Sequence, residues 1–269
     1  MKKAAFIVIV LAVAFVFSLV SFNSVFAHPT ISLLDEIQKR GVIKVGMFLQ
    51  YPPTEYRDPV TKEPKGLNVD LANILAKDLK VKLEIVDMEW DAIIPGLLAR
   101  KYDICIASMS RKPSRNLSIA FTSVNTEDYA IMGMVRPNET RATIADFNKK
   151  GTVITCLLGG ITEHAARRFF PNAEIKPMQQ MPAVLEVVSG RADMICAENV
   201  FAYNYIRKNP GKLKMVFEEN PLSHEPSAIS MRKGDQILLN WMDNWLQFQW
   251  DNRVMQDLID KWVIKGVAD

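Results

Sequence analysis

Cysteine is scarce in this sequence, and neither charge is in large excess. Among 269 residues, only Cys105, Cys156 and Cys196 carry thiols. Small exported proteins that rely on disulfides have more cysteines and an even number of them, so this chain is not of that class. Lys and Arg number 33 and Asp and Glu number 30, which argues against the concentrated basic face that a nucleic-acid partner requires. Apolar burial must therefore hold the core together.

Long apolar runs are missing after the first 27 residues. The run long enough to span a bilayer, AAFIVIVLAVAFVFSLV, begins at Ala4. Lys2 and Lys3 precede it, and Val25–Ala27 fits the small-residue rule for signal peptidase. The sequence predicts a signal peptide over 1–27, cleavage before His28, and export of a soluble product to the periplasm. An uncleaved N-terminal anchor is the alternative.

One stretch of the sequence occurs twice. LARKYDICIAS, residues 98–108, aligns without a gap with VSGRADMICAE, residues 188–198. Three pairs of residues fall into register: Lys101 with Arg191, Asp103 with Asp193, and Ser108 with Glu198. Each copy has the pattern of a helix, a turn and a buried strand that ends in a polar residue. We infer two similar lobes, each of which presents a polar group at the carboxyl end of a strand.

Strand and helix patterns alternate in both halves of the chain. The first half predicts strands over 42–48, 81–86 and 102–107 with helices between them, and the second predicts strands over 152–158, 173–178 and 193–197. This order indicates a mostly parallel sheet covered by helices in each lobe. Two extended segments, about 123–137 and 222–231, interrupt the alternation and are expected to join the lobes as hinge strands. The expected lobe 1 therefore comprises residues 28–126 and 225–269, and lobe 2 comprises residues 127–224.

Ligands of open α/β sheets bind beyond the carboxyl ends of the strands, so the polar groups there are candidate site residues. Ser108 and Ser110 offer hydroxyls after a strand of lobe 1, and Arg115 can grip a carboxylate with two parallel hydrogen bonds. A solvated Arg115 at a helix start is the alternative. In lobe 2, Gly159 and Gly160 precede a predicted helix whose free N–H groups would attract an anion.

The sequence resembles the extracytoplasmic solute-binding proteins of family 3, the polar amino-acid receptors of ABC importers. The resemblance extends from about Leu33 to Val263. It rests on YPP after the first strand, GLNVDLANILAKDL, WDAIIPGLLARKYDICIASMS, the Pro-x-Arg of KPSR, AFT, and SGRADMICAEN. It implies a two-lobed periplasmic-binding-protein fold of type II, with two hinge strands between the lobes.

The resemblance also implies roles for single residues. Arg115 matches the arginine that clamps the ligand's α-carboxylate, and Glu198 matches the carboxylate, usually Asp, that holds the ligand's ammonium group. Ser108 and Ser110 match small residues that bind the same end of the ligand. The remaining expected contacts are the aromatic walls Tyr51 and Trp90 and the start of the lobe 2 helix at Gly160, Ile161 and Thr162.

Several positions depart from the family pattern. Ile161 stands where the family has Thr after the Gly of lobe 2, and Thr162 is displaced by one position. Arg111 and Lys112 replace the Ile-Thr that precedes Pro-x-Arg, and whether they contact a ligand is left open. A ligand outside the standard amino acids is therefore possible. Trp90 can also be read as a core residue at a helix start.

The sequence supports two functions. The first is a monomeric binding protein that closes on an amino-acid-like zwitterion and delivers it to a membrane permease, without a cofactor. The second is an enzyme on the same scaffold, because the family resembles the cyclohexadienyl dehydratases, which act on prephenate or arogenate. That chemistry needs a general acid, for which Glu198 and Glu163 are the candidates. The first is favoured because Glu198 is already explained as an ammonium counter-ion. His and Cys residues show no spacing typical of a metal site.

Overall fold

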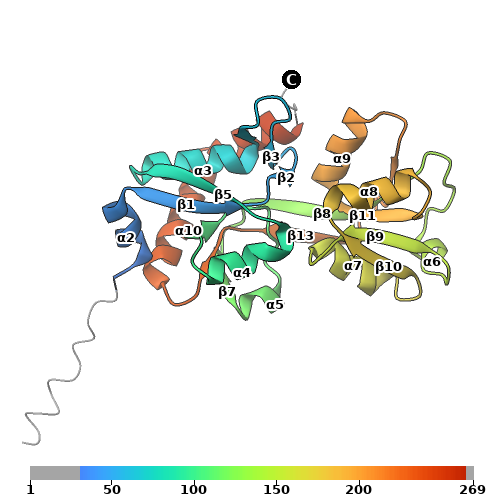
Figure 1. Cartoon of the computed structure of the whole chain (residues 1–269), viewed down its shortest axis with the longest axis horizontal. Helices are drawn as coiled ribbons and strands as arrows, with labels where there is room; N and C mark the ends of the chain where they lie inside the picture. Colours follow the sequence, from blue (N-terminus) through green and yellow to red (C-terminus); the bar gives the residue numbers. More distant parts are fainter. Residues whose placement is uncertain (1–30, 265–269) are drawn as a thin grey trace, which may run out of the picture.

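The computed structural model describes residues 31–264, so the predicted signal peptide over 1–27 lies outside the described residues. The described chain forms two α/β lobes that lie side by side, with β8 (Glu127–Val135) running between them (Figure 1). The predicted two-lobed α/β fold is thus confirmed. Within residues 31–264, no helix has the length and apolar character needed to cross a bilayer.

Lobe 1 is built on a five-stranded sheet of order β5-β1-β6-β14-β7. β1 (Val42–Met47) lies in parallel between β5 (Lys82–Asp87) and β6 (Ile104–Cys105), as the β-α-β-α-β pattern predicts. β14 (Ser230–Arg232) and β7 (Ile119–Phe121) extend the sheet in antiparallel pairing. The other elements of the lobe are α2 (Leu33–Arg40), the small sheet of β2 (Gln50–Tyr51), β3 (Glu55–Arg57) and β4 (Pro64–Lys65), α3 (Leu67–Asp78), η2 (Trp90–Ala92), α4 (Ile93–Leu98), α5 (Pro113–Asn116), α10 (Gln236–Asp251), α11 (Val254–Ile259) and η3 (Asp260–Ile264).

Lobe 2 repeats the parallel part of this sheet. β9 (Val153–Leu157) lies in parallel between β10 (Glu174–Met178) and β11 (Met194–Glu198). β8 pairs antiparallel with β11, and β12 (Lys214–Val216) and β13 (Ser223–Ser227) both pair with β8. The helices of the lobe are α6 (Ile144–Phe147), α7 (Ile161–Phe169), α8 (Gln180–Val188) and α9 (Asn199–Lys208).

The repeated aspartates perform the same structural task in both lobes. The Asp103 carboxylate accepts a hydrogen bond from the Lys44 backbone N–H of β1 at 2.8 Å and pairs with Arg40. The Asp193 carboxylate accepts from the Val153 backbone N–H of β9, also at 2.8 Å, and pairs with Arg141. Each aspartate therefore fixes the turn before a central strand. This shared role explains why the motif occurs in both residues 98–108 and residues 188–198.

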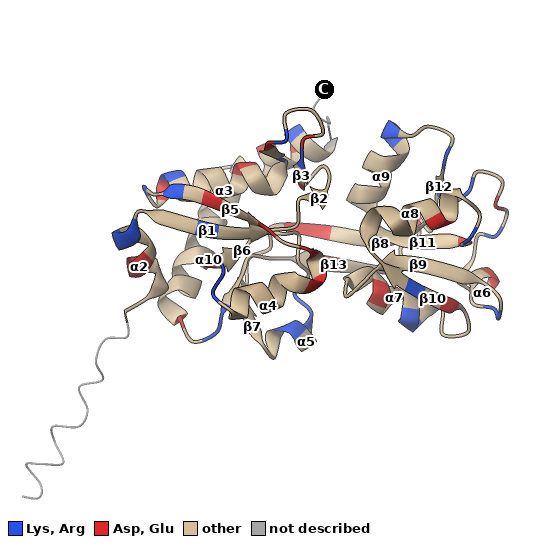
Figure 2. Ribbon diagram, in the orientation of Figure 1, with Lys and Arg blue, Asp and Glu red and all other residues tan. Residues whose placement is uncertain are grey.

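The segments that join the lobes run beside each other. β13 pairs with β8 from Ser223 opposite Ile131 to Ser227 opposite Glu127. Beyond this ladder, the Thr126 N–H donates to the Ser227 carbonyl at 2.9 Å, and the hydroxyls of the same two residues are also 2.9 Å apart. Figure 2 shows acidic residues at the end of β8 that lies between the lobes. The connection between the lobes is therefore a two-stranded ribbon of β8 and β13 that carries acidic residues.

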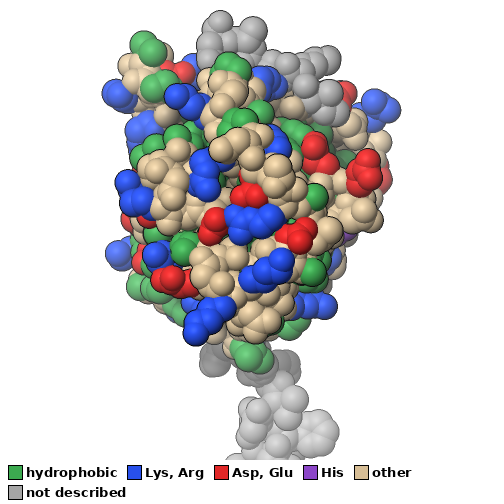
Figure 3. Space-filling model, turned by 90° about the vertical axis from the view of Figure 1, so that its right-hand side faces the viewer, with side chains coloured by type: hydrophobic (Ala, Val, Ile, Leu, Met, Phe, Trp, Pro, Cys, Tyr) green, Lys and Arg blue, Asp and Glu red, His purple; other side chains and the backbone are tan. Residues whose placement is uncertain are grey.

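Buried apolar side chains form three clusters, and one of them draws on both lobes. This shared cluster includes Tyr51 and Ile93 of lobe 1 and Leu157 and Phe201 of lobe 2. The three cysteines are buried and free, as expected for small apolar side chains. On the outer end of lobe 2, Figure 3 shows basic and acidic side chains interspersed, without a field of one sign on that face.

Removing either repeated carboxylate should destabilise the protein. Asp103→Ala leaves the Lys44 N–H without its acceptor, and Asp193→Ala does the same for Val153. An unpaired buried donor costs about 1–3 kcal/mol, so urea unfolding should show a loss of that size for each variant. The control is Asp128→Ala, an exposed acid on β8, which should change the free energy of unfolding by less than about 0.5 kcal/mol. Losses no larger than that of the control would contradict this role.

Candidate functional site

The two lobes contact each other around the predicted site residues. The Tyr51 ring of lobe 1 stacks on the Phe201 ring of α9, with centroids 5.5 Å apart and an interplanar angle of 17°. Nη2 of Arg115 donates to the Gly159 carbonyl of lobe 2 at 3.2 Å. These contacts close the cleft, so the polar groups at the strand ends are withdrawn from water.

Arg115 lies on α5, a short helix that begins with Pro113 at its first position, where the fixed φ of proline suits a helix start. Its side chain is 8% exposed, and Nη1 donates to the Ser110 carbonyl at 3.0 Å. The guanidinium carbon stands 5.4 Å from the centre of the Trp90 ring. Arg115 is thus buried and ordered between the lobes, and the alternative of a solvated arginine does not describe this structure.

Glu198 is the last residue of β11, at the carboxyl end of a buried strand, as the sequence predicts. Its side chain is 8% exposed, and Oε2 has no hydrogen-bond partner within residues 31–264. Burial raises the pKa of the Glu198 carboxyl, although Tyr51 and Arg115 both act to lower it. Burial, and next the Glu198 charge, raises the pKa of the Tyr51 hydroxyl, which makes no hydrogen bond within geometric limits.

Two further acidic residues lie in the same interior, and neither was predicted from the sequence to belong to the site. Glu55 of β3 is fully buried, and Glu127 at the start of β8 is 7% exposed. Nδ2 of Asn68 donates to the Glu55 carboxylate at 2.6 Å and to the Ser108 hydroxyl at 2.9 Å. The Ser108 oxygen is 3.1 Å from the Glu55 carboxylate and 3.3 Å from the Glu127 carboxylate. The Ser108 hydroxyl therefore lies between two buried carboxyl groups.

The remaining predicted residues occupy the edges of this interior. Trp90 is half-buried, packs edge-on against Phe48, and lines a pocket of about 170 Å³ together with Arg115 and Gly159. Gly160 caps α7, and a Cβ there would lie 2.9 Å from the Leu157 carbonyl oxygen, so the position requires glycine. Ile161 and Thr162 are buried in the first turn of α7, and the Thr162 hydroxyl accepts from the Leu157 N–H at 3.3 Å.

Negative groups outnumber positive ones in the closed interior. Three carboxyl groups of this interior, on Glu55, Glu127 and Glu198, are less than one-tenth exposed. Asp58 and Asp103 are buried to the same degree but form ion pairs with Lys65 and Arg40. Arg115 is the one cation buried to this degree within residues 31–264. Polar atoms there also lack hydrogen-bond partners in the described part of the chain: Tyr51 Oη, Glu55 Oε1, Asn68 Oδ1, Glu127 Oε1, Tyr129 Oη and Glu198 Oε2. Buried polar groups are normally paired. This arrangement can bind an anionic group at Arg115 and cationic groups at the carboxylates.

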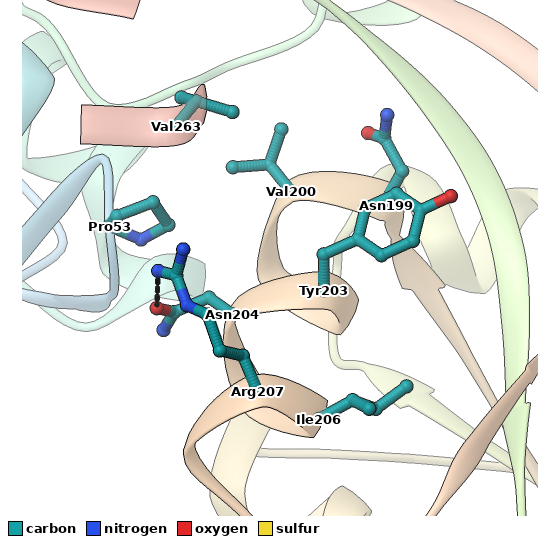
Figure 4. A pocket seen from close by; sticks show the side chains of 8 residues that line it. All are labelled: Pro53, Asn199, Val200, Tyr203, Asn204, Ile206, Arg207 and Val263. Atoms are coloured by element: carbon teal, nitrogen blue, oxygen red, sulfur yellow. Dashed lines mark hydrogen bonds between the residues drawn. The ribbon is translucent and has the colours of Figure 1, made fainter. Parts of the chain in front are cut away.

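Larger hollows lie along α9, away from Arg115. A pocket of about 520 Å³ separates α9 from lobe 1, and Figure 4 shows Val200 and Arg207 of α9 facing Pro53 and Val263 of lobe 1. A neighbouring pocket of about 390 Å³ reaches Glu127 on the hinge strand. Both pockets share Val200 and Val263, so they follow one seam between the lobes.

The missed acids left a signal in the sequence. Glu127 begins an apolar extended run, EDYAIMGMV, and so repeats at a strand's start the pattern that Glu198 shows at a strand's end. Glu55 follows the Pro-rich loop YPPT, where a polar residue reads as exposed. Its burial depends on the short sheet β2-β3-β4 folding against α3, which no local pattern reveals.

Comparisons with known proteins agree with this geometry. A model of the bacterial extracellular solute-binding proteins, family 3, matches residues 43–265. The octopine-binding periplasmic protein of Rhizobium meliloti is 42% identical over 219 residues, which are 70% of this chain and 72% of that protein. Cyclohexadienyl dehydratase of Pseudomonas aeruginosa is 24% identical over 236 residues, which are 86% of each protein.

Solved structures show the same fold. An ancestral amino acid-binding protein, described as a precursor of cyclohexadienyl dehydratase, is 34% identical, with a TM-score of 0.79 over 86% of this chain and 99% of that chain. An ABC transporter binding component from Wolinella succinogenes, in complex with lysine, is 30% identical, with a TM-score of 0.78 over 84% and 97%. The chain therefore belongs to family 3 of the bacterial extracellular solute-binding proteins, the polar amino acid-binding proteins of ABC transporters.

Proposed function

We propose that this protein captures, in the periplasm, an amino acid or amino-acid derivative with a cationic side chain and delivers it to an ABC importer. The observation that carries the proposal is the excess of carboxyl groups in the closed cleft. Glu55, Glu127 and Glu198 are buried there, whereas Arg115 is the one cation buried to the same degree within residues 31–264. Desolvated charges are costly unless they are paired, so the missing positive charge is assigned to the ligand.

Arg115 and Glu198 form the clamp for the ligand's amino-acid end. The Arg115 guanidinium is the buried cation, and its Nη atoms reach only backbone carbonyls at Ser110 and Gly159. A ligand carboxylate would offer it the stronger, charge-assisted bonds. Glu198 has an unpaired carboxylate oxygen and is the proposed acceptor for the ligand's ammonium group. The two residues belong to different lobes, so a bound zwitterion would tie the lobes together.

The other predicted site residues complete this proposal. Tyr51 and Trp90 supply the aromatic walls, with the unpaired Tyr51 hydroxyl facing the same interior as the carboxylates. On the lobe 1 side of the cleft, the Ser110 carbonyl accepts a hydrogen bond from Arg115, and the Ser108 hydroxyl lies between Glu55 and Glu127. The lobe 2 side is the start of α7, formed by Gly160, Ile161 and Thr162, where the helix N-terminus favours an anionic group.

The relatives support a cationic ligand. One relative is named for octopine and one structure holds lysine. Another structure, 35% identical over 86% of this chain with a TM-score of 0.69, is of an ancestral cationic amino acid solute-binding protein. Octopine is an arginine whose α-nitrogen carries a carboxyethyl group, so these ligands all combine a carboxylate with more than one basic nitrogen. The excess of buried acids in the cleft suits that charge pattern.

In this proposal, closure of the two lobes on the ligand is what allows delivery to a transporter. A ligand that pairs with both lobes stabilises the closed arrangement by its differential affinity for it. The proposed hinge is the ribbon of β8 and β13. A membrane permease would recognise and bind the closed form of the monomer. Export through the signal peptide proposed for residues 1–27 would place the protein in the periplasm.

Breaking the clamp should abolish tight binding without unfolding the protein. Arg115→Lys and Glu198→Gln each leave one ligand charge desolvated and poorly paired, which costs about 2–5 kcal/mol in binding. This corresponds to a dissociation constant roughly thirty- to several-thousand-fold higher. Isothermal titration with a panel of L-arginine, L-lysine, octopine and L-glutamine measures the effect.

Glu174→Gln is the matched control, because Glu174 is an exposed acid of β10 whose partner is Lys176. This variant should bind every ligand of the panel as the unaltered protein does. Binding that survives in both clamp variants would remove Arg115 and Glu198 from the site. If no member of the panel binds the unaltered protein, the proposed ligand class is wrong.

A dehydratase is the second candidate, and one observation favours it. Burial raises the pKa of the Glu198 carboxyl, as a general acid in the cleft would require. We nevertheless expect no phenylpyruvate or phenylalanine above background when the protein is incubated with prephenate or arogenate. In the proposed complex Glu198 faces an ammonium group, which keeps its carboxylate ionised. Arogenate carries such a group and would leave Glu198 no proton to donate, whereas prephenate lacks the ammonium group that this end of the cleft is proposed to bind. Turnover that Glu198→Gln abolishes would reverse this ranking.

A further inference from the structure

Two carboxyl groups from different sheets meet at one hydroxyl. Oε2 of Glu55 and Oε2 of Glu127 are 3.1 Å and 3.3 Å from the Ser108 oxygen, which also accepts a hydrogen bond from Asn68. Ser108 has one proton to share between the two carboxylates. Its φ of 50° lies in the left-handed region that non-glycine residues rarely adopt. The chain thus accepts backbone strain to hold this hydroxyl between the two acids.

Each of these acids has an oxygen that nothing in the described chain satisfies. Glu55 Oε1 and Glu127 Oε1 are both buried and make no hydrogen bond within residues 31–264. Neither acid forms an ion pair with a described Lys, Arg or His, whereas Glu198 feels the charge of Arg115. Two buried carboxylates so close together repel each other unless a proton or another cation lies between them.

We propose that Glu55 and Glu127 receive the cationic end of the ligand's side chain, and that in the empty protein the pair holds a proton which this cation displaces. Glu127 is then a specificity-determining residue, and it lies on the hinge strand itself. The inference rests on the proposed function, because it presumes that an amino acid occupies the cleft beside Arg115 and Glu198. Glu55 and Glu127 form the subsite for the ligand's side chain, and binding there is coupled to release of a proton.

The charges around the pair support a bound proton. Burial raises the pKa of Glu127 to about 8. Burial, and next the Glu127 charge, raises the pKa of Glu55 well above its ordinary value. Tyr51 of β2 and Cys105 of β6 are the other titratable groups that interact with these carboxyls, and neither is a cation. Further off, Glu198 of β11 faces the Tyr51 hydroxyl, and Tyr129 follows Glu127 on β8 with Glu225 of β13 opposite it. Arg115 is the nearby cation, and its charge acts on Cys105 and Glu198.

The sign of the linkage follows from these pKa directions. A guanidinium or ammonium group beside Glu127 favours the ionised carboxylate, so binding lowers its pKa and the proton leaves. Below about pH 8 the affinity for a cationic amino acid should therefore rise with pH, and above it the affinity should level off. A neutral side chain cannot displace this proton. Glu198 can also release one when any zwitterion binds, so the difference between two ligands isolates the pair.

The test counts protons calorimetrically. The unaltered protein is titrated at pH 7 with L-arginine and with L-glutamine, each in phosphate and in Tris, whose ionisation enthalpies differ. We expect L-arginine to release most of one proton more than L-glutamine does, because Glu127 is mainly protonated at that pH. Equal proton release for the two ligands would overturn the proposal while leaving amino-acid binding intact. If neither ligand nor L-lysine binds, the proposed function fails instead.

Two variants test whether Glu127 carries the displaced proton. Glu127→Gln should weaken L-arginine binding about tenfold or more, abolish its extra proton release, and leave L-glutamine binding within about threefold. Asp128→Asn is the matched control, because Asp128 is the next residue of β8 and its side chain is exposed on the other face. It should leave both quantities unchanged.

A metal ion is the other cation that could occupy the pair. Competition of CaCl2 or NaCl with L-arginine, lost in Glu127→Gln, would assign the pair to a metal ion and overturn the proposal. If Glu127→Gln does not fold, Glu127→Asp and the proton count of the unaltered protein still decide the question. An unchanged preference for L-arginine over L-glutamine in a folded Glu127→Gln variant would also refute it.

Discussion

More carboxyl groups than cations are buried between the lobes, and the site depends on this imbalance of charge. Arg115 and the carboxyl groups of Glu55, Glu127 and Glu198 lie in an interior from which water is largely excluded. Charges in such a place are costly unless they are paired or protonated. Polar oxygens of this interior lack hydrogen-bond partners within residues 31–264. In the proposed function, a positively charged ligand pairs with them, and the imbalance of charge sets the class of ligand.

The fold delivers these charges by using one unit twice. In each lobe an aspartate fixes the turn before a central strand: Asp103, which is buried, and Asp193, which is half-buried. The strands then end at the junction of the lobes, where Ser108 and Glu198 follow at equivalent positions. β8 and β13 join the lobes as a two-stranded ribbon, and in the proposed function this ribbon is the hinge about which the two strand ends approach each other.

The sequence predicted what local patterns can carry. The repeat predicted the two lobes, the alternating elements predicted the parallel part of each sheet, and the position at a strand end singled out Glu198 as a candidate site residue. Arg115 was found through its motif. Glu55 and Glu127 were missed because their burial comes from tertiary packing: a three-stranded sheet folds over α3 for the first, and the hinge ribbon passes through the interior for the second. The stacking of Tyr51 on Phe201 likewise joins residues 150 positions apart.

If the acids buried between the lobes are counter-ions for a ligand's side-chain cation, a neutral analogue must bind weakly. The dissociation constants of L-arginine and L-citrulline, measured by isothermal titration, test this, because citrulline has nearly the same shape with a neutral ureido group. We expect L-arginine to bind at least about thirtyfold more tightly, because citrulline leaves a buried carboxylate without its partner. Equal dissociation constants for the two ligands would contradict it.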